Sequence, residues 1–324
     1  MDQGNSSYAC QAYVEGSTTS YGYVPSFAAG VAFVALFGFS MVAHTAQMAL
    51  LKSWWCAVFA IGCLVEILGW SARIWSNKCP YAQTPYLMQI TTLIIADYSM
   101  APTFFTAGIY VLLGRLIRIC GPQSSALSPK LYLWIFCTCD VVSLIVQAAG
   151  GGIASSGNMA ETSSSSNSSQ TTGTHIMVGG IIFQLISITI FVGFAADFIW
   201  RVLRKSKSAV PINRTMLALF AATAFSVLLI YIRSIYRTIE LMDGWTSSTM
   251  QNENLLIGLD GAMMVPAVII YNLFHPGWML AKIKSNRQLP SSLPLLISCA
   301  RPSSHGDEAK ENGADPDGVT SKRG

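Results

Sequence analysis

Seven long apolar runs constrain the fold of this chain more than any other feature of its sequence. A helix needs about 20 predominantly apolar residues to cross the hydrocarbon core of a bilayer. The runs of this kind are Val24–Leu50, Trp54–Ile74, Tyr86–Leu112, Leu131–Ile153, Met177–Phe198, Thr215–Tyr236 and Leu255–Leu280. Because the hydrocarbon core holds no water for free backbone groups to bind, such runs are expected to be helices. We therefore predict an all-α polytopic membrane protein with seven transmembrane helices.

The composition excludes an ordinary soluble domain. Hydrophobic residues make up 52% of the 324 residues and charged residues only 11%, whereas about a quarter of the residues in a soluble domain are charged. The formal net charge of +4 is modest and gives no indication of a nucleic-acid partner. The positions of the basic residues along the chain are more informative, because they report orientation.

The basic residues fall in alternate connections between the runs, which predicts the direction of threading because cytosolic loops are enriched in Lys and Arg. The side expected to be cytosolic carries Lys52, Arg115, Arg118, Lys130, Arg201, Arg204, Lys205, Lys207, Arg214, Lys282, Lys284 and Arg287. We therefore expect residues 1–23 to be an extracellular segment and residues 24–280 the transmembrane domain. Residues 281–324, rich in proline and acidic residues, are expected to be a disordered cytosolic tail.

Several features on the predicted outer side agree with this threading. Asn5 and Asn167 each begin an Asn-X-Ser glycosylation motif. Cys10 and Cys79 are the two cysteines expected on the oxidising outer face, and they are candidates for a disulfide. The segment Ser155–Gly173 is rich in Ser, Thr and Asn, a composition typical of a flexible outer loop.

Polar side chains within the runs gather on particular helical faces when residues are placed at steps of about 100°. Those expected in the outer half or at the outer rim are Glu66, Arg73, Gln147, Gln184, Arg233, Arg237, Glu240 and Asp260. One interpretation is an interhelical salt-bridge network. The other is a polar ligand-binding or translocation site, in which Arg73 or Arg233 meets an acidic head group and Glu66 or Asp260 meets an amine.

Three further groups, His44, Asp140 and His275, are expected in the inner third of the membrane. Imidazoles and a carboxylate could form a proton relay or hold zinc, and the other interpretation of His275 is an interfacial histidine without a special role. The sequence has no HExxH motif and only two histidines within the runs, so we predict no metal and no other cofactor. The run Gly150 to Gly152 is expected either to end a helix or to allow close backbone approach.

Taken together, the spaced polar motifs resemble the fungal lipid-translocating exporter family, seven-span proteins associated with aminocholesterol resistance and release of sphingoid long-chain bases. The resemblance covers about Tyr21 to Gly277. It departs from the family at Asp97, between Glu253 and Asp260, and in the serine-rich fourth connection. The residues that carry it are Tyr21 to Ser26 and His44; Glu66, Gly69 and Arg73; Gln89, Ala101, Pro102, Tyr110, Gly114 and Arg115; Asp140, Ser143, Gln147 and Gly150 to Gly152; Gly180 and Gln184; and Arg233, Tyr236, Arg237, Glu240, Gly244, Glu253, Asp260 and His275 to Gly277.

The resemblance implies a plasma-membrane protein that moves amphipathic lipids, such as sphingoid bases, sterol-like compounds or toxic amphiphiles, toward the outer leaflet and so confers resistance. Such a protein is not an enzyme, and its partners are membrane lipids or amphipathic small molecules. The sequence has no nucleotide-binding loop, so ATP bound to this chain is not expected to drive transport. Two alternatives stay open: a seven-helix receptor for an amphipathic ligand, and an intramembrane metal-dependent lipid hydrolase built on His44, Asp140 and His275.

Overall fold

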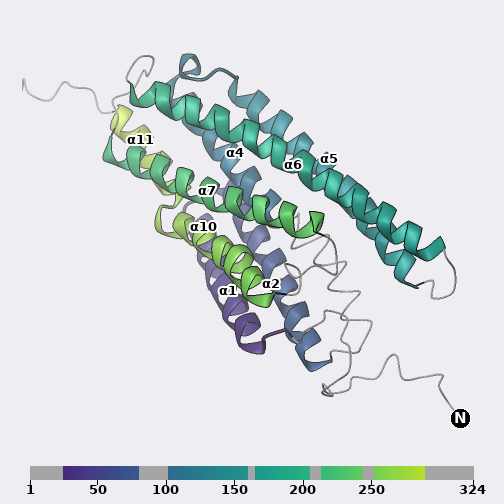
Figure 1. Cartoon of the computed structure of the whole chain (residues 1–324). Helices are drawn as coiled ribbons and strands as arrows, with labels where there is room; N and C mark the ends of the chain where they lie inside the picture. Colours follow the sequence, from purple (N-terminus) through teal and green to yellow (C-terminus); the bar gives the residue numbers. More distant parts are fainter. Residues whose placement is uncertain (1–24, 80–100, 160–164, 205–212, 244–251, 289–324) are drawn as a thin grey trace, which may run out of the picture. The chain divides into compact units, whose positions relative to one another are not determined.

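The computed structural model describes residues 25–79, 101–159, 165–204, 213–243 and 252–288, and within these ranges the chain is helical and contains no strand (Figure 1). Seven helical segments there are long and apolar enough to cross a membrane, which confirms the predicted fold class. Five of the segments are single helices: α1 (Phe27–Leu50), α4 (Ala101–Cys120), α5 (Pro129–Met159), α6 (Ser165–Leu203) and α7 (Arg214–Met242). The second segment joins η2 (Trp54–Cys56) to α2 (Ala57–Lys78). The seventh consists of α9 (Glu253–Leu256), η5 (Ile257–Gly261), α10 (Ala262–Leu273) and α11 (Pro276–Gln288).

The turn between α1 and η2 is a Schellman motif, a common helix ending. The Ser53 amide donates to the carbonyl of Met48 (3.1 Å), and the Lys52 amide donates to the carbonyl of Ala49 (3.4 Å). Lys52 has a φ of 49°, the left-handed conformation that glycine usually supplies at this position. The motif therefore fixes Lys52 in a backbone conformation that is uncommon for a residue with a side chain.

Helix α4 lies at the centre of the helical packing, with contacts to α2, α5, α6 and α7. Its buried residues include Phe105, which faces Gly62 of α2: a Cβ at Gly62 would overlap the Phe105 ring. Gly62 thus leaves room on the second span for an aromatic side chain of the third. The helix starts at Ala101 and extends past the predicted end at Leu112 to Cys120; residues 86–100 of that prediction lie outside the described residues.

Helices α5 and α6 run side by side over most of their length (Figure 1). A Cβ at Gly150 would lie 2.6 Å from the Met177 amide nitrogen and 2.7 Å from the Gly173 carbonyl oxygen. Only glycine allows two backbones to approach so closely. Gly150 therefore serves close approach, and the glycine run does not end the helix, which continues to Met159.

This close packing corrects the prediction of a flexible loop over Ser155–Gly173. Helix α5 continues to Met159 and α6 begins at Ser165, so much of the serine-rich segment is helical. The composition misled the prediction because pairing with a neighbouring helix stabilises backbone that serine and threonine alone would not hold in a helix.

The seventh segment is irregular where it carries its acidic residue. Between α9 and α10, the residues Ile257–Gly261 form a π-helix that contains Asp260. A π-bulge of this kind inserts an extra residue in one turn and often occurs at functional sites. Helix α10 packs against α1 and α7. Helix α11 continues to Gln288, into the segment predicted as the tail.

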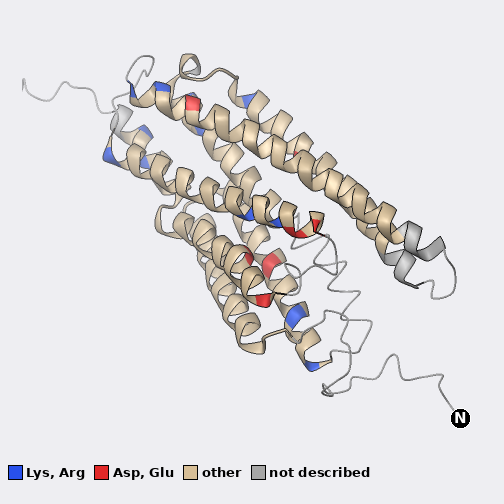
Figure 2. Cartoon of the chain, in the orientation of Figure 1, with Lys and Arg blue, Asp and Glu red and all other residues tan. Residues whose placement is uncertain are grey.

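Basic residues are concentrated at the end of the helices where α6 finishes and α7 begins (Figure 2). This end includes the α1 to α2 turn with Lys52, the last turns of α4 with Arg115 and Arg118, and Lys284 of α11, which together line one pocket. The structure thus brings basic residues from separate connections to one end. That this end faces the cytosol remains the expectation from their distribution.

Candidate functional site

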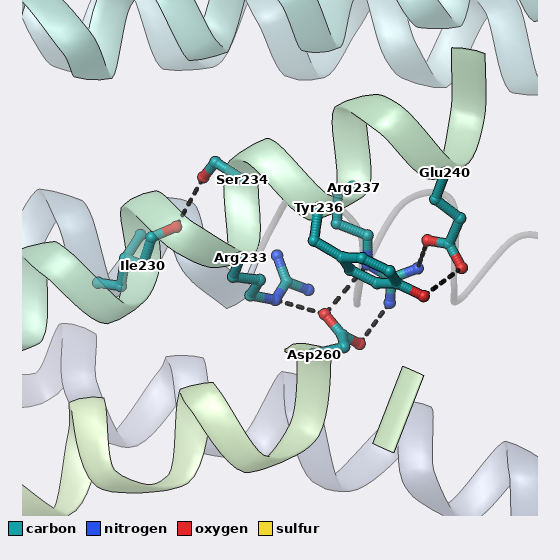
Figure 3. A network of polar contacts seen from close by, with 7 residues as sticks. All are labelled: Ile230, Arg233, Ser234, Tyr236, Arg237, Glu240 and Asp260. Atoms are coloured by element: carbon teal, nitrogen blue, oxygen red, sulfur yellow. Dashed lines mark hydrogen bonds and ion pairs between the residues drawn. The ribbon is translucent and has the colours of Figure 1, made fainter. Parts of the chain in front are cut away.

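A buried network of charged residues joins α7 to the π-helix (Figure 3). Asp260 accepts contacts from two arginines of α7: Arg233 Nε lies 2.5 Å from its Oδ1, and Arg237 Nε donates to the same oxygen at 3.0 Å. The second terminal nitrogen of Arg237 contacts the other Asp260 oxygen. Arg237 also donates to Glu240 at 2.7 Å, and the Tyr236 hydroxyl donates to Glu240 at 3.1 Å.

The spacing of these residues explains why they meet. Arg233, Arg237 and Glu240 follow one another at i, i+4 and i+7 on α7 and therefore share one face of that helix. The exposed fractions are 2% for Arg233 and Arg237, 1% for Glu240 and 6% for Asp260. Because burying an unpaired charge is strongly unfavourable, the compact pairing is what makes this burial possible.

Glu66 of α2 adds a third carboxylate to this network. It is 3% exposed and interacts electrostatically with Arg233, Asp260 and Arg237. Its Oε1 is buried and has no hydrogen-bond partner among the described residues. When all groups are ionised, Glu66, Glu240 and Asp260 face two arginines, so the buried network holds one acid more than it holds bases.

Arg73, about two helical turns beyond Glu66 and one turn beyond Gly69 on α2, lies in a second pair. Its guanidinium is 3.7 Å from Glu253 Oε1 at the start of α9 and 5.6 Å from the centre of the Trp70 ring. Glu253 also accepts a 2.6 Å hydrogen bond from the amide of Ser26, just before α1. This pair therefore ties the beginnings of the first and seventh segments to α2.

The two glutamines predicted for the site form a chain between α4, α5 and α6. Gln147 donates to Gln184 at 3.0 Å and to Ser143 at 2.6 Å, and Gln184 donates to the Thr103 hydroxyl at 3.3 Å. Gln184 also lines a cavity of about 20 Å³ with Pro102, Arg233 and Arg237. A space of this size holds about one water molecule, so the Gln184 amide and the two arginines of the charged network face a common small cavity.

Sequence reasoning left two contributors out of the predicted site. Tyr236 donates to Glu240, and Glu253 pairs with Arg73. The i to i+4 spacing of Tyr236 and Glu240 was a usable signal for the first. No local signal existed for the second, because the contact joins residues 180 positions apart.

His44 and His275 lie in a separate polar region between α1, α10 and the start of α11. His44 stacks on Phe59 with ring centres 5.5 Å apart, and it interacts electrostatically with His275. Asn272 donates to Ser40 at 2.7 Å, and Gln47 donates to the Asn272 carbonyl at 2.8 Å. Several buried atoms here have no hydrogen-bond partner at normal geometry within the described residues: both His44 nitrogens, His275 Nε2, Tyr271 Oη, Asn272 Oδ1, Gln47 Oε1 and Ser53 Oγ.

Asp140, the third residue of the predicted inner relay, lies elsewhere. It accepts hydrogen bonds from Tyr110 (3.0 Å) and Thr106 (3.3 Å) of α4. In the part of the chain that the structure describes, no three His, Cys, Asp or Glu side chains form a group that could hold a metal ion. The structure therefore brings His44 toward His275 but does not bring Asp140 to them, so the zinc centre required by the hydrolase alternative is not assembled.

The other predicted positions are only partly described. Cys79 is disulfide-bonded, and its predicted partner Cys10 lies outside the described residues, as do Asn5 and Asp97. Asn167 lies in the first turn of α6. The pairing of Cys10 with Cys79 and the glycosylation of Asn5 and Asn167 stay predictions.

Comparisons with known proteins identify the relatives of this chain. The Sphingoid long-chain base transporter RSB1 of Saccharomyces cerevisiae is 28% identical over 290 residues, covering 79% of this chain and 73% of that protein. Protein RTM1 from the same species is 29% identical over 211 residues, covering 65% and 63% of the two chains. Protoporphyrin uptake protein 1, also from this yeast, is 29% identical over 216 residues and 66% of each chain. No solved structure matches.

These relatives confirm the family resemblance predicted from the polar motifs. The profile described as RTA1 like protein matches residues 59–283, which include most of the second span, the charged network and His275 between α10 and α11. The match extends over more than half of the sequence. The chain therefore belongs to the RTA1-like family.

Proposed function

We propose that this protein moves amphipathic lipids of the sphingoid long-chain base class across the bilayer toward the outer leaflet. A relative that covers most of the chain is named as a sphingoid long-chain base transporter. The seven apolar helices place the protein in the membrane, where such lipids reside. Amphipathic cargo of this class combines one amine with a long hydrocarbon chain, so its binding site needs an acidic group within an apolar wall.

The observation that supports this substrate class is the excess carboxylate of the buried network. Asp260 and Glu240 are paired with arginines, whereas Glu66 keeps one oxygen without a hydrogen-bond partner among the described residues. A protonated amine near Glu66 would balance the network and supply that hydrogen bond. Glu66 is therefore proposed as the amine-recognition residue, with Asp260 and the two arginines holding its surroundings in place.

Reconstitution into liposomes tests this proposal directly. Purified full-length protein is incorporated into phosphatidylcholine vesicles, and the transbilayer movement of a labelled sphingoid base is followed by its accessibility to an external quencher. We expect faster movement than in protein-free vesicles, and a loss of at least about tenfold in rate for Glu66→Gln, since a charge-assisted hydrogen bond contributes roughly 1.5–3 kcal/mol. Asp197→Asn on α6, an exposed carboxylate paired with Arg201, is the matched control and should behave as wild type.

The same vesicles distinguish the exporter from the receptor. A protein that binds the sphingoid base but leaves its transbilayer movement at the protein-free rate would contradict transport and favour the seven-helix receptor. If transport occurs and Glu66→Gln leaves it unchanged, the amine-recognition role is wrong while the transporter assignment survives. Collapse of an imposed proton gradient without any effect on the rate would exclude proton coupling.

The cellular part of the proposal follows from the same activity. An exporter in the plasma membrane, with its N-terminus outside and its tail in the cytosol, would lower the cellular load of toxic amphiphiles and confer resistance. Expression of the chain in a yeast strain sensitive to sphingoid bases is expected to restore growth, and Glu66→Gln is expected to fail at an equal protein level. A fluorescent tag confined to internal membranes would contradict the assigned location.

A further inference from the structure

A basic pocket lies at the opposite end of α2 from the Arg73 to Glu253 pair. It has a volume of about 580 Å³ and is lined by the α1 to α2 turn, the last turns of α4 and the first turns of α11. This volume falls in the usual range of ligand pockets, roughly 300–1,000 Å³. Its lining includes four cationic residues and no acidic one: Lys52, Arg115, Arg118 and Lys284.

None of these four cations forms an ion pair with an acid among the described residues. The salt bridges there involve Arg73, Arg201, Arg233 and Arg237 instead. Arg115 stacks on the ring of Trp55, with its guanidinium carbon 4.5 Å from the ring centre, which fixes its direction without neutralising its charge. Four like charges converging on one pocket repel one another, so the arrangement favours an anionic ligand.

Two features of the pocket wall also point to a ligand. Lys52 occupies the left-handed position of the Schellman motif, where glycine is favoured; strained positions of this kind cluster at ligand sites. Ser53, 7% exposed, also lines the pocket, and its hydroxyl makes no hydrogen bond of normal geometry within the described residues. A Cβ at Gly277, another lining residue, would lie 2.9 Å from that hydroxyl, so glycine keeps the space beside it free.

The chemistry of the surroundings identifies the ligand class. A protonated sphingoid amine would be repelled, so this pocket does not serve the proposed substrate. Several phosphate groups match four cations, because each phosphate monoester carries about −1.5 to −2 charges. The rim is apolar, with Trp54 70% and Leu51 42% exposed, as expected where acyl chains continue into the membrane. We propose that the pocket binds the multiply phosphorylated head group of an anionic membrane lipid, of the phosphoinositide type.

Direct binding to the purified full-length protein tests the proposal. The probe is a phosphatidylinositol bisphosphate in phosphatidylcholine nanodiscs, with the fluorescence of the lining residues Trp54 and Trp55 as a readout and vesicles of phosphatidylcholine alone as the blank. Neutralising three of the cations together is expected to weaken binding roughly 100-fold, at about 1 kcal/mol for each basic residue near an anionic lipid. The variant is Arg115→Gln, Arg118→Gln, Lys284→Gln.

A control variant removes the same charge outside the pocket. It carries Lys130→Gln, Arg204→Gln and Lys282→Gln; the last two cations also stack on tryptophan rings, 4.3 Å and 5.0 Å from the ring centres. We expect this control to bind within about twofold of wild type once general electrostatic attraction is screened by salt. Equal losses in the pocket variant and the control would overturn the site, as would unchanged binding by the pocket variant.

A soluble competitor tests whether the pocket binds a membrane lipid or a free phosphate compound. Inositol trisphosphate offers the same phosphates without acyl chains; if it binds as tightly as the lipid, the membrane-lipid assignment is wrong. Should the triple variant fail to fold, as judged by its thermal unfolding without lipid, the exposed single change Arg118→Gln replaces it, with an expected loss of roughly fivefold. Transport of a sphingoid base plays no part in these measurements, so they are independent of the proposed function.

Discussion

Replacing Asp260 by asparagine removes the acid that neutralises two buried arginines. Arg233 and Arg237 both contact the Asp260 carboxylate, and each arginine is 2% exposed. Removing one partner of a buried ion pair costs about 3–5 kcal/mol, because the remaining charge is left without compensation. Glu240 still pairs with Arg237, which leaves Arg233 as the side chain that suffers most. We therefore expect Asp260→Asn to lower the free energy of unfolding by an amount in this range.

Thermal unfolding in nanodiscs measures the effect. For domains of about 150–250 residues, 1 kcal/mol corresponds to about 2–4 °C in Tm; on that scale Asp260→Asn is expected to unfold roughly 6–20 °C below wild type. The matched control is Asp197→Asn, which acts at the exposed pair with Arg201, where the two side chains are 38% and 37% exposed; its cost should stay within about 1 kcal/mol.

The double variant Arg233→Gln, Asp260→Asn should recover part of the loss, because the uncompensated arginine is then gone. A Tm for Asp260→Asn within about 2 °C of wild type would refute the reasoning. It would mean that water or a ligand, rather than the two arginines, determines the environment of this carboxylate. If Asp260→Asn keeps the stability of the wild type but loses transport, the ligand-site interpretation is favoured over the salt-bridge interpretation.

Two further variants test other parts of the structure. Gly150→Leu places a side chain against the backbone of α6, where a Cβ would already lie 2.6 Å from the Met177 amide nitrogen. We therefore expect a loss of at least about 3 kcal/mol in stability. The control is Gly152→Leu, because nothing lies within 4 Å of a Cβ at that position; equal Tm values for the two variants would contradict the close packing. His44→Phe replaces a buried imidazole whose nitrogens make no hydrogen bond of normal geometry among the described residues, so stability should rise by about 1 kcal/mol. A proton relay through His44 predicts instead that pH-dependent transport is lost. A less stable but fully active variant would contradict both expectations.

The structure shows how the salt-bridge and ligand-site interpretations of the buried charges fit together. Helical spacing predicted that Arg233, Arg237 and Glu240 share a face, and they do. It could not tell that Asp260 would reach both arginines, because that contact depends on the π-helix at Ile257–Gly261. Pairing and a ligand site are therefore compatible: four charges hold one another, and Glu66 is the acid that the pairs leave over.

The depth of a residue in the membrane did not predict which of the inner polar residues come together. His44, Asp140 and His275 were grouped because each lies at a similar distance along its span. The rotation of each helix about its own axis then decided their partners: Asp140 turns toward Tyr110 and Thr106, whereas His44 lies beside Phe59 and is within electrostatic range of His275. Sequence spacing gives the rotation of residues within a helix but not the direction that this helix faces in the bundle.

The sequence by itself determined the seven helices, because the cost of unsatisfied backbone in lipid leaves an apolar run of that length no other structure. It also determined that basic residues would gather at one end, since helices of similar length must alternate in direction. Tertiary structure alone decided which charges are paired, that Gly150 joins α5 to α6, and that the basic ends of α4 and α11 enclose a pocket with Lys52. These outcomes depend on contacts between residues far apart in the chain, and local periodicity carries no information about such contacts.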